Sequence, residues 1–368
     1  MGASSSDARW RLARWRLALA AGAFAIAYAL SAARIGHGAP DFYVFWTAAR
    51  HWQAPYDPAI VAQLLAGLHL KGVWPFAYPP TFLLFVWPFA KLPLELAYPL
   101  WVGLESALFV FAASHLVKPV WATAALALAP AVFFSAELGQ TSLIVGAAMI
   151  GGWLLRDKRP ALAGVLFGLA ACVKPQAMIL APIVLWGRWR MLAWMAGTGA
   201  AVALASLGFG WRRWLEWPQA LAAFKALVPQ TDRINPSALV AGSGALALGW
   251  AAVLGAAGVA LAAKSRDLLG LVAGALCLTP YAHAYDLAPL TPLAAAWVFA
   301  PRTHGWGRAA AGGALLAGLV ATPAAALGFV AALLVFHVRW PGLRLPALLA
   351  PAVDAPNAAP ELASEAAS

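Results

Sequence analysis

The sequence contains very little cysteine and very little charge. Its two cysteines, Cys172 and Cys277, cannot form the disulfide framework of a small secreted domain, and both lie in apolar stretches as small core residues. Only 11% of the 368 residues are charged, whereas 63% are hydrophobic and the mean hydropathy is +0.75. Apolar runs this numerous cannot all be buried in one soluble core. We therefore expect an all-α polytopic membrane protein.

Acidic residues are scarce, with 14 Asp and Glu against 25 Lys and Arg and a net charge of +11. A basic balance of this size can indicate nucleic-acid binding. Here, however, the basic residues form short clusters between apolar segments, the pattern of orientation signals and of contacts with anionic lipids. We expect membrane lipids as partners and no nucleic acid.

Nucleotide-binding motifs are also missing from the sequence. It contains no GxxxxGK[ST] loop, no GxGxxG after a strand and no paired-aspartate nucleotide-sugar motif. No spacing of His, Asp and Glu matches a standard metal site. These absences argue against a nucleotide-driven reaction, and we expect no cofactor and no metal.

The apolar stretches predict helices, and the basic clusters predict their orientation. The predicted helices are 16–33, 97–116, 120–136, 139–155, 160–173, 176–187, 189–209, 239–263, 267–281, 286–300, 308–320 and 323–338. With the basic N-terminus, 1–15, in the cytoplasm ahead of an uncleaved signal anchor, most Lys and Arg lie on the cytoplasmic side. This predicts a single multi-pass domain, 16–345, in the plasma (inner) membrane and a disordered tail, 346–368.

Two connections on the outer side are long, residues 34–96 and 210–238. Within the first, the apolar stretch 81–90 is too short to cross a bilayer of about 30 Å, and prolines flank it. We expect an interfacial or re-entrant helix there. In this topology the unusual polar residues reach the same outer face: Asp41, Asp57, Glu137, Gln140, Lys174, His283 and Asp286.

Asp41 is the most informative of these residues, because an uncompensated carboxylate at a membrane boundary costs several kcal/mol. It can act as a general base toward a hydroxyl, or it can cap an interfacial helix that begins at this point. The two roles are compatible. Asp57, between Tyr56 and Pro58, fits a turn or a helix cap better than a catalytic role.

The remaining polar residues leave alternatives open. Lys174 ends one short predicted helix and begins another, so its side chain can reach the interface or hold a phosphate. Gln140 and Glu137, between two predicted spans, can hydrogen-bond a polar ligand or cap the following helix. His283, with Asp286 nearby, can be structural, bind phosphate as imidazolium or relay a proton.

Together these segments resemble the GT-C membrane glycosyltransferases, and most closely glycosyltransferase family 87. The resemblance runs from about residue 15 to residue 300. The matching pieces are Asp41 with its aromatic helix, Tyr56-Asp57, Tyr78-Pro79-Pro80, Gly139-Gln140, the stretch from Gly164 to Lys174-Pro175-Gln176, and Pro280 to Asp286. The family often has Asn two residues after the Gly-Gln pair, where this chain has Ser142.

The resemblance implies a GT-C-like bundle of about twelve transmembrane helices whose long first outer loop carries interfacial helices. It also implies an enzyme that moves a sugar, commonly mannose, from a polyprenyl monophosphate to a lipid or glycan acceptor. The active site would lie on the periplasmic or extracellular face. By analogy, Asp41 is the general base, and the sugar is transferred with inversion.

The leaving lipid phosphate needs cations or hydrogen-bond donors beside it. By the same resemblance, the donor phosphate and sugar are expected to contact Lys174, His283, Gln140, Arg50 and Asp286, with Asp57, Tyr78 and Glu137 in support. A transporter or lipid flippase is the alternative, although the chain shows no internal repeat of the kind transporters often have. A non-enzymatic scaffold would leave the convergence of polar residues unexplained.

Overall fold

The computed structural model is built from helices. It describes residues 5–34, 40–68, 75–117, 120–127, 129–227, 245–279, 282–299 and 305–316. No strand occurs in these ranges, so the expected all-α class is confirmed for the described chain. The predicted helix 323–338, the tail 346–368 and the end of the second outer loop, 228–238, lie outside the described residues.

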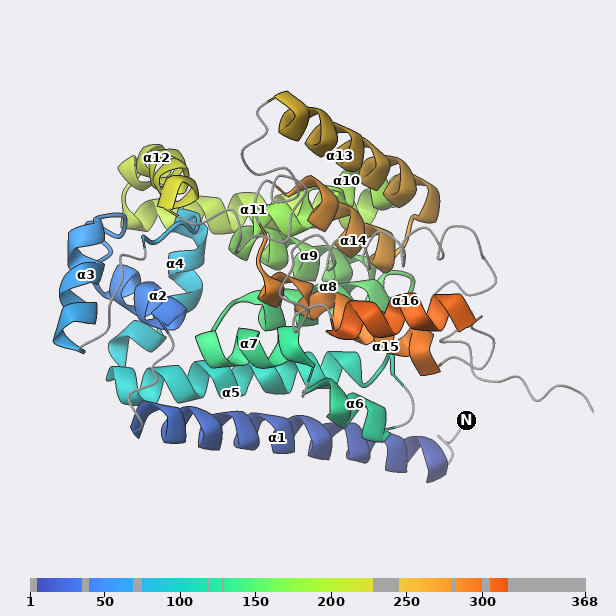
Figure 1. Ribbon diagram of the computed structural model, residues 1–368. Coiled ribbons are helices and arrows are strands. Elements are labelled where there is room, and N and C mark those ends of the chain that lie inside the picture. The colour runs from blue at the N-terminus through green and yellow to red at the C-terminus, as the bar shows by residue number, and fades with distance from the viewer. Residues whose placement is uncertain are drawn as a thin grey trace, which may run out of the picture.

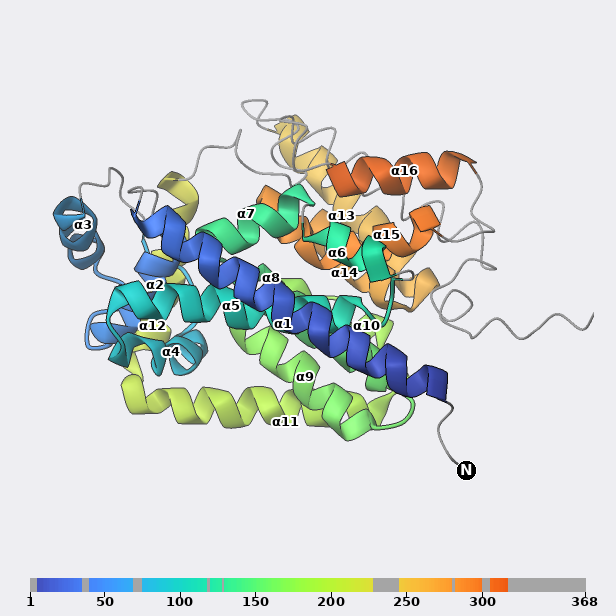
Figure 2. The same cartoon turned by 90° about the horizontal axis from the view of Figure 1, so that it is seen from below.

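Two long helices, α1 (Ser5–Arg34) and α5 (Leu94–Ala113), lie side by side along the lower edge in Figure 1, and α1 runs across the front in Figure 2. Small residues allow this approach, because a Cβ added at Gly22 would lie only 3.0 Å from the carbonyl oxygen of Gly103. Close backbone contact through small residues is a common mode of helix packing in membranes.

The centre of the molecule is a succession of packed helices. α8 (Ser142–Leu155) packs on α9 (Pro160–Val173), and α9 packs on α11 (Trp189–Ser206). α14 (Leu268–Leu278) and the 3₁₀ segment η6 (Ala284–Leu290) pack against α8.

The other elements complete the bundle around this centre. They are α6 (Val120–Leu126), α7 (Pro130–Leu138), η2 (Pro175–Met178), α10 (Ala181–Val184), η3 (Leu207–Phe209), α13 (Ala245–Ser265), α15 (Thr291–Phe299) and α16 (Gly305–Leu316).

The helices of the two outer loops gather at one end of the molecule, at the left of Figures 1 and 2. They are α2 (Pro40–Arg50), α3 (Pro58–Gly67), α4 (Pro80–Val86), the short turn η1 (Phe89–Lys91) and α12 (Arg212–Leu227). The stretch expected to be interfacial is therefore mainly α4, a helix of seven residues, and α4 packs on α2, α9 and α11.

Two of the described helical segments are long and apolar enough to cross a membrane, Leu94–Ala113 and Trp189–Phe209. Several other apolar helices are shorter; α8, with 14 residues, extends about 21 Å against a hydrocarbon core of about 30 Å. The predicted helix 120–136 is divided before Pro130, and 176–187 is divided between η2 and α10. The expectation of about twelve spans is not confirmed.

Candidate active site

Asp41 lies in the first turn of α2. Pro40 precedes it at the first helical position, where a missing backbone N–H costs nothing, and a carboxylate in the first turn is stabilised by the helix dipole. The following residues of α2, 42–49, are buried, whereas Asp41 as a residue is partly exposed. The buried residues of the helix thus hold Asp41 in place at the start of α2.

The turn after α7 brings an amide group to this carboxylate. Gly139 ends α7 with φ of 62°, a left-handed conformation that favours glycine, and its carbonyl accepts a hydrogen bond from Trp101 Nε1 at 3.0 Å. A Cβ at Gly139 would lie 2.7 Å from Phe42 Cβ, so the turn lies directly against α2. Gln140 Nε2 then donates to Asp41 Oδ2 at 2.8 Å.

Tyr78 contacts the other end of the same amide. Its hydroxyl donates to Gln140 Oε1 at 2.8 Å and lies 3.0 Å from Thr141 Oγ1. The backbone N–H of Thr141 also donates to Gln140 Oε1, at 3.3 Å. Gln140 is only 3% exposed. The amide therefore directs its nitrogen to Asp41 and its oxygen to Tyr78.

The environment raises the pKa of Asp41 to about 6. Desolvation by the surrounding protein is the largest cause. The hydrogen bond from Gln140 and the positive charge of Lys174 lower the pKa of Asp41, and the negative charge of Asp286 raises it. A carboxylate with this pKa is mostly ionised at pH 7 and accepts a proton more readily than an ordinary aspartate.

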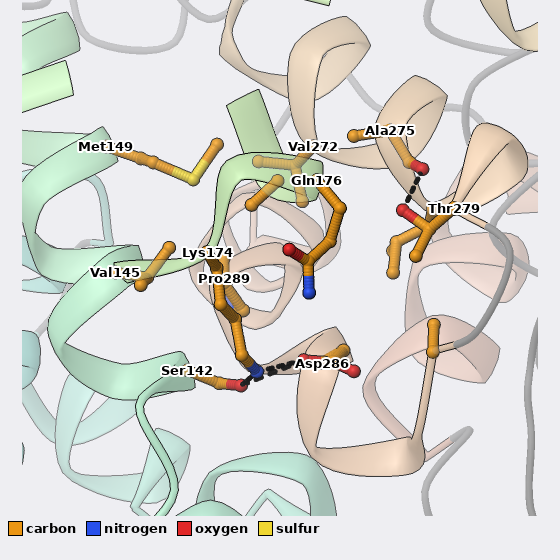
Figure 3. Close-up of a pocket in the computed structure, with 13 residues that line it drawn as sticks. Ser142, Val145, Met149, Lys174, Gln176, Val272, Ala275, Thr279, Asp286 and Pro289 are labelled. Atoms are coloured by element: carbon orange, nitrogen blue, oxygen red, sulfur yellow. Dashed lines mark hydrogen bonds and ion pairs between the residues drawn. The ribbon is translucent and has the colours of Figure 1, made fainter. Parts of the chain in front are cut away.

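Lys174 lies at the break between α9 and η2. Because Pro175 disfavours a helical conformation in the residue before it, Lys174 has φ of −132° and ψ of 83°. Its side chain is buried, pairs with Asp286 Oδ1 at 2.5 Å and donates to Ser142 Oγ at 2.9 Å (Figure 3). Ser142 Oγ also donates to Asp286 Oδ1, at 3.1 Å.

The segment before and within η6 holds Asp286 in place. The backbone N–H of His283 donates to Asp286 Oδ2 at 2.9 Å, as part of a capping arrangement. The ring of His283 stacks on that of Tyr285, with centroids 5.1 Å apart. Lys174 Nζ lies 5.1 Å from the Tyr285 centroid, within the range of a cation–π contact. The predicted proximity of His283, Asp286 and Lys174 is thus observed.

The two groups of side chains adjoin, since Gln140 bonds to Asp41 and Ser142, two residues further on, bonds to Lys174. A pocket with about 430 Å³ of space lies beside Lys174. Figure 3 shows the amide of Gln176 directed toward its centre. The apolar part of its lining includes Val145, Met149, Val272, Ala275 and Pro289. The site can therefore hold a polar group at Lys174 next to an apolar surface.

Arg50 does not reach this cluster. It is nine residues after Asp41 in the same helix, which separates the two by about 13 Å along the axis. Its guanidinium lies 4.9 Å from the centroid of the Trp46 ring and donates to the carbonyl of Ala90 at 3.3 Å.

Asp57 and Glu137 also lie apart from these contacts. Asp57 is exposed and caps α3, accepting a hydrogen bond from Ala59 N at 2.9 Å, which confirms its expected role as a cap. Glu137 accepts a hydrogen bond from the hydroxyl of Tyr28 at 3.3 Å. Within the described residues, no group of three or more His, Cys, Asp or Glu side chains is arranged to hold a metal ion.

Several residues of the site were not among the expected ones: Thr141, Ser142, Gln176 and Tyr285. The sequence marks Ser142 only as a departure from the family pattern, although its position two residues after Gln140 in the same turn is a usable signal. Tyr285 gave no signal, because an aromatic residue beside an apolar helix is common in such a chain.

In the described part of the chain, an all-helical fold links a desolvated carboxylate, through the turn 140–142, to a buried lysine that lines a pocket. Residues 76–282 match glycosyltransferase family 87. Because this is more than half of the chain, the protein belongs to that family, and the resemblance seen in the sequence is confirmed. A comparison with curated proteins and one with solved structures each gave no match.

The matched range includes Tyr78, Gln140 and Lys174 but not Asp41 or Asp286. Family membership therefore identifies a glycosyltransferase, and the roles of Asp41 and Asp286 depend on the contacts described above.

Proposed function

We propose that the protein is an inverting membrane glycosyltransferase that uses a polyprenyl monophosphate sugar, by analogy mannose, and glycosylates a lipid or glycan hydroxyl. Glycosyl transfer follows from the family; the donor, sugar, acceptor and stereochemistry are the proposal. One observation carries it: the Gln140–Ser142 turn links a carboxylate of raised pKa, Asp41, to a buried cation, Lys174.

We further propose a multi-pass protein of the plasma membrane with its N-terminus in the cytoplasm and its site on the periplasmic or extracellular face. The two helical segments of sufficient length support insertion in a membrane. The shorter apolar helices can lie at membrane depth where they pack against protein or border a cavity, since their unpaired backbone groups then avoid lipid. The outer-loop helices, gathered at one end in Figure 1, would form the outer face.

Asp41 is proposed as the general base. The acceptor hydroxyl attacks the anomeric carbon while its proton passes to the Asp41 carboxylate. The bond between the anomeric carbon and the phosphate oxygen breaks, and its electron pair leaves with the lipid phosphate. The pKa of about 6 suits this role, because the group is ionised before the reaction and accepts a proton during it.

Lys174 is proposed to hold the donor phosphate. An ammonium group has three N–H donors, and the contacts with Ser142 and Asp286 use two of them. The third is left for a phosphate oxygen, whose negative charge grows as the sugar departs. Gln176, which lines the pocket, and His283, which is held beside Asp286, are the further donors that we propose. The apolar lining next to Lys174 suits the isoprenoid carbons adjoining the phosphate.

The test is a transfer assay with purified protein in lipid nanodiscs and a lipid extract of the source cells as acceptor. Radiolabelled mannose is supplied either on polyprenyl monophosphate or on a nucleotide diphosphate. We expect transfer from the lipid donor with wild-type protein and none with Asp41→Asn. Transfer from the nucleotide sugar alone would refute the proposed donor, and transfer by Asp41→Asn would refute the proposed base.

A further inference from the structure

We propose that Gln140 is a positioning residue for Asp41 and that Tyr78 fixes the direction of the Gln140 amide. This inference rests on the role of Asp41 as base proposed above. It gives Gln140 a different task from the substrate contact expected from the sequence. The observation behind it is a continuous chain of hydrogen bonds from Tyr78 through Gln140 to Asp41.

The hydrogen bonds allow only one orientation of the amide. A side-chain amide has a donor end and an acceptor end. Here the acceptor end receives the Tyr78 hydroxyl and the backbone N–H of Thr141, and the donor end faces the carboxylate of Asp41. Reversing the amide would turn its oxygen toward a carboxylate and its NH₂ toward an N–H that can only donate. Both contacts would then be repulsive.

The backbone around Gln140 leaves the side chain little freedom. Gln140 N donates to the carbonyl of Ser135 at 2.8 Å, and the preceding Gly139 lies against Phe42. The side chain is buried and its amide is hydrogen-bonded at both ends, so the amide holds the carboxylate in a defined position. Because Asp41 Oδ2 accepts the Gln140 hydrogen bond, Oδ1 is the oxygen left for the proton of the acceptor.

The same hydrogen bond controls the protonation of the base. Asp41 interacts with the charges of Lys174 and Asp286. The ionisable residues Tyr78, Tyr98 and Glu95 also lie near α2. Among these influences the Gln140 hydrogen bond lowers the pKa of Asp41, opposing desolvation. Without it, the carboxylate would hold its proton to higher pH and fewer molecules would carry the active base at neutral pH.

The experiment measures kcat/KM for transfer against pH with Gln140→Leu, Tyr78→Phe and wild-type protein. A hydrogen bond to a charged group stabilises the charged form, here the carboxylate of Asp41. Gln140→Leu should therefore move the acidic limb of the pH profile, where kcat/KM rises as Asp41 ionises, upward by about one pH unit. Since the wild-type pKa of Asp41 is about 6, activity should fall only about twofold at pH 7, approach a tenfold loss near pH 5, and recover at higher pH. The KM for the donor should stay unchanged. Gln63→Leu, the same change on the exposed face of α3, is the matched control.

A general loss of folded protein would lower activity equally at every pH, so the shift of the limb separates positioning from structural damage. Tyr78→Phe keeps nearly the same volume and should shift the limb in the same direction by less, because the Thr141 N–H still holds the amide. It also carries the test if Gln140→Leu fails to fold.

An unshifted limb with a raised donor KM would make Gln140 a substrate ligand and overturn the inference. An inactive Asp41→Asn together with unshifted Gln140→Leu and Tyr78→Phe would leave the base assignment standing and remove only the positioning role. An active Asp41→Asn would instead remove the base itself.

Discussion

Replacing Asp41 with Asn is expected to abolish sugar transfer and at the same time to stabilise the protein. The fold raises the pKa of this carboxyl from 3.8 to about 6. A difference of about 2 pH units corresponds to about 3 kcal/mol. Since the residue is partly exposed, we expect a cost of about 2 kcal/mol at pH 7. Asn cannot ionise, yet its side-chain oxygen can still accept the Gln140 hydrogen bond.

The sign of the effect follows from proton binding. Between pH 4 and pH 6 the folded wild-type protein binds more protons at residue 41 than the unfolded chain, so its stability falls as the pH rises through this window. Below pH 4 both states are protonated, and above pH 6 the full cost is present. The advantage of Asp41→Asn should therefore be absent near pH 4 and constant above pH 6.

The assay is thermal unfolding followed by tryptophan fluorescence in detergent, at one scan rate, from pH 4 to pH 8. A stabilisation of about 2 kcal/mol should raise the Tm of the variant by several degrees at pH 7. Asp57→Asn is the control, because Asn caps a helix as well as Asp and the residue is exposed. A destabilised Asp41→Asn, or a difference independent of pH, would refute this account of the Asp41 environment.

Three further changes test other parts of the site. Gly139→Ala would place a Cβ 2.7 Å from that of Phe42 at a residue with positive φ. We expect the free energy of unfolding to fall by about 1–3 kcal/mol, as measured by thermal unfolding, and transfer activity to fall with it. Wild-type stability would contradict the close packing of this turn. Glu105 is 1% exposed, and in the described structure neither of its carboxylate oxygens has a hydrogen-bond partner. Glu105→Leu should therefore stabilise the folded protein by about 1–3 kcal/mol. Loss of transfer without this stabilisation would instead assign Glu105 to the site. Lys174→Ala should raise the donor KM at least tenfold more than the acceptor KM. An unchanged donor KM would exclude the phosphate role. Lys174→Arg, which keeps the positive charge beside Asp286, is the control variant.

The sequence predicted the helices best where prolines define their ends. The predicted helix 160–173 has the same bounds as α9, which begins at Pro160 and stops before Pro175. At two prolines inside apolar runs the prediction of one continuous helix was wrong, although α5 continues through Pro99. Residues 120–136 divide before Pro130, and the stretch after 286 begins as 3₁₀ helix around Pro289. Proline removes a backbone donor and clashes with the preceding turn, an effect stronger than hydropathy.

For the site, the sequence indicated which residues would converge but not how they would pair. The partners of Gln140 depend on the close approach of Gly139 to Phe42, a tertiary contact that no local pattern encodes. The distance of Arg50 from Asp41, in contrast, follows from helix geometry once residues 40–50 are read as one helix. Local rules thus located the elements, and the hydrogen-bond partners required the assembled fold.

The most direct test of the central claim is mass spectrometry of envelope lipids and glycans from a deletion strain complemented with wild-type protein or with Asp41→Asn at equal expression. We expect one glycosylated product to disappear on deletion, to return with the wild-type protein and to stay absent with Asp41→Asn. Equal restoration by both proteins would contradict Asp41 as the base of a glycosyl transfer.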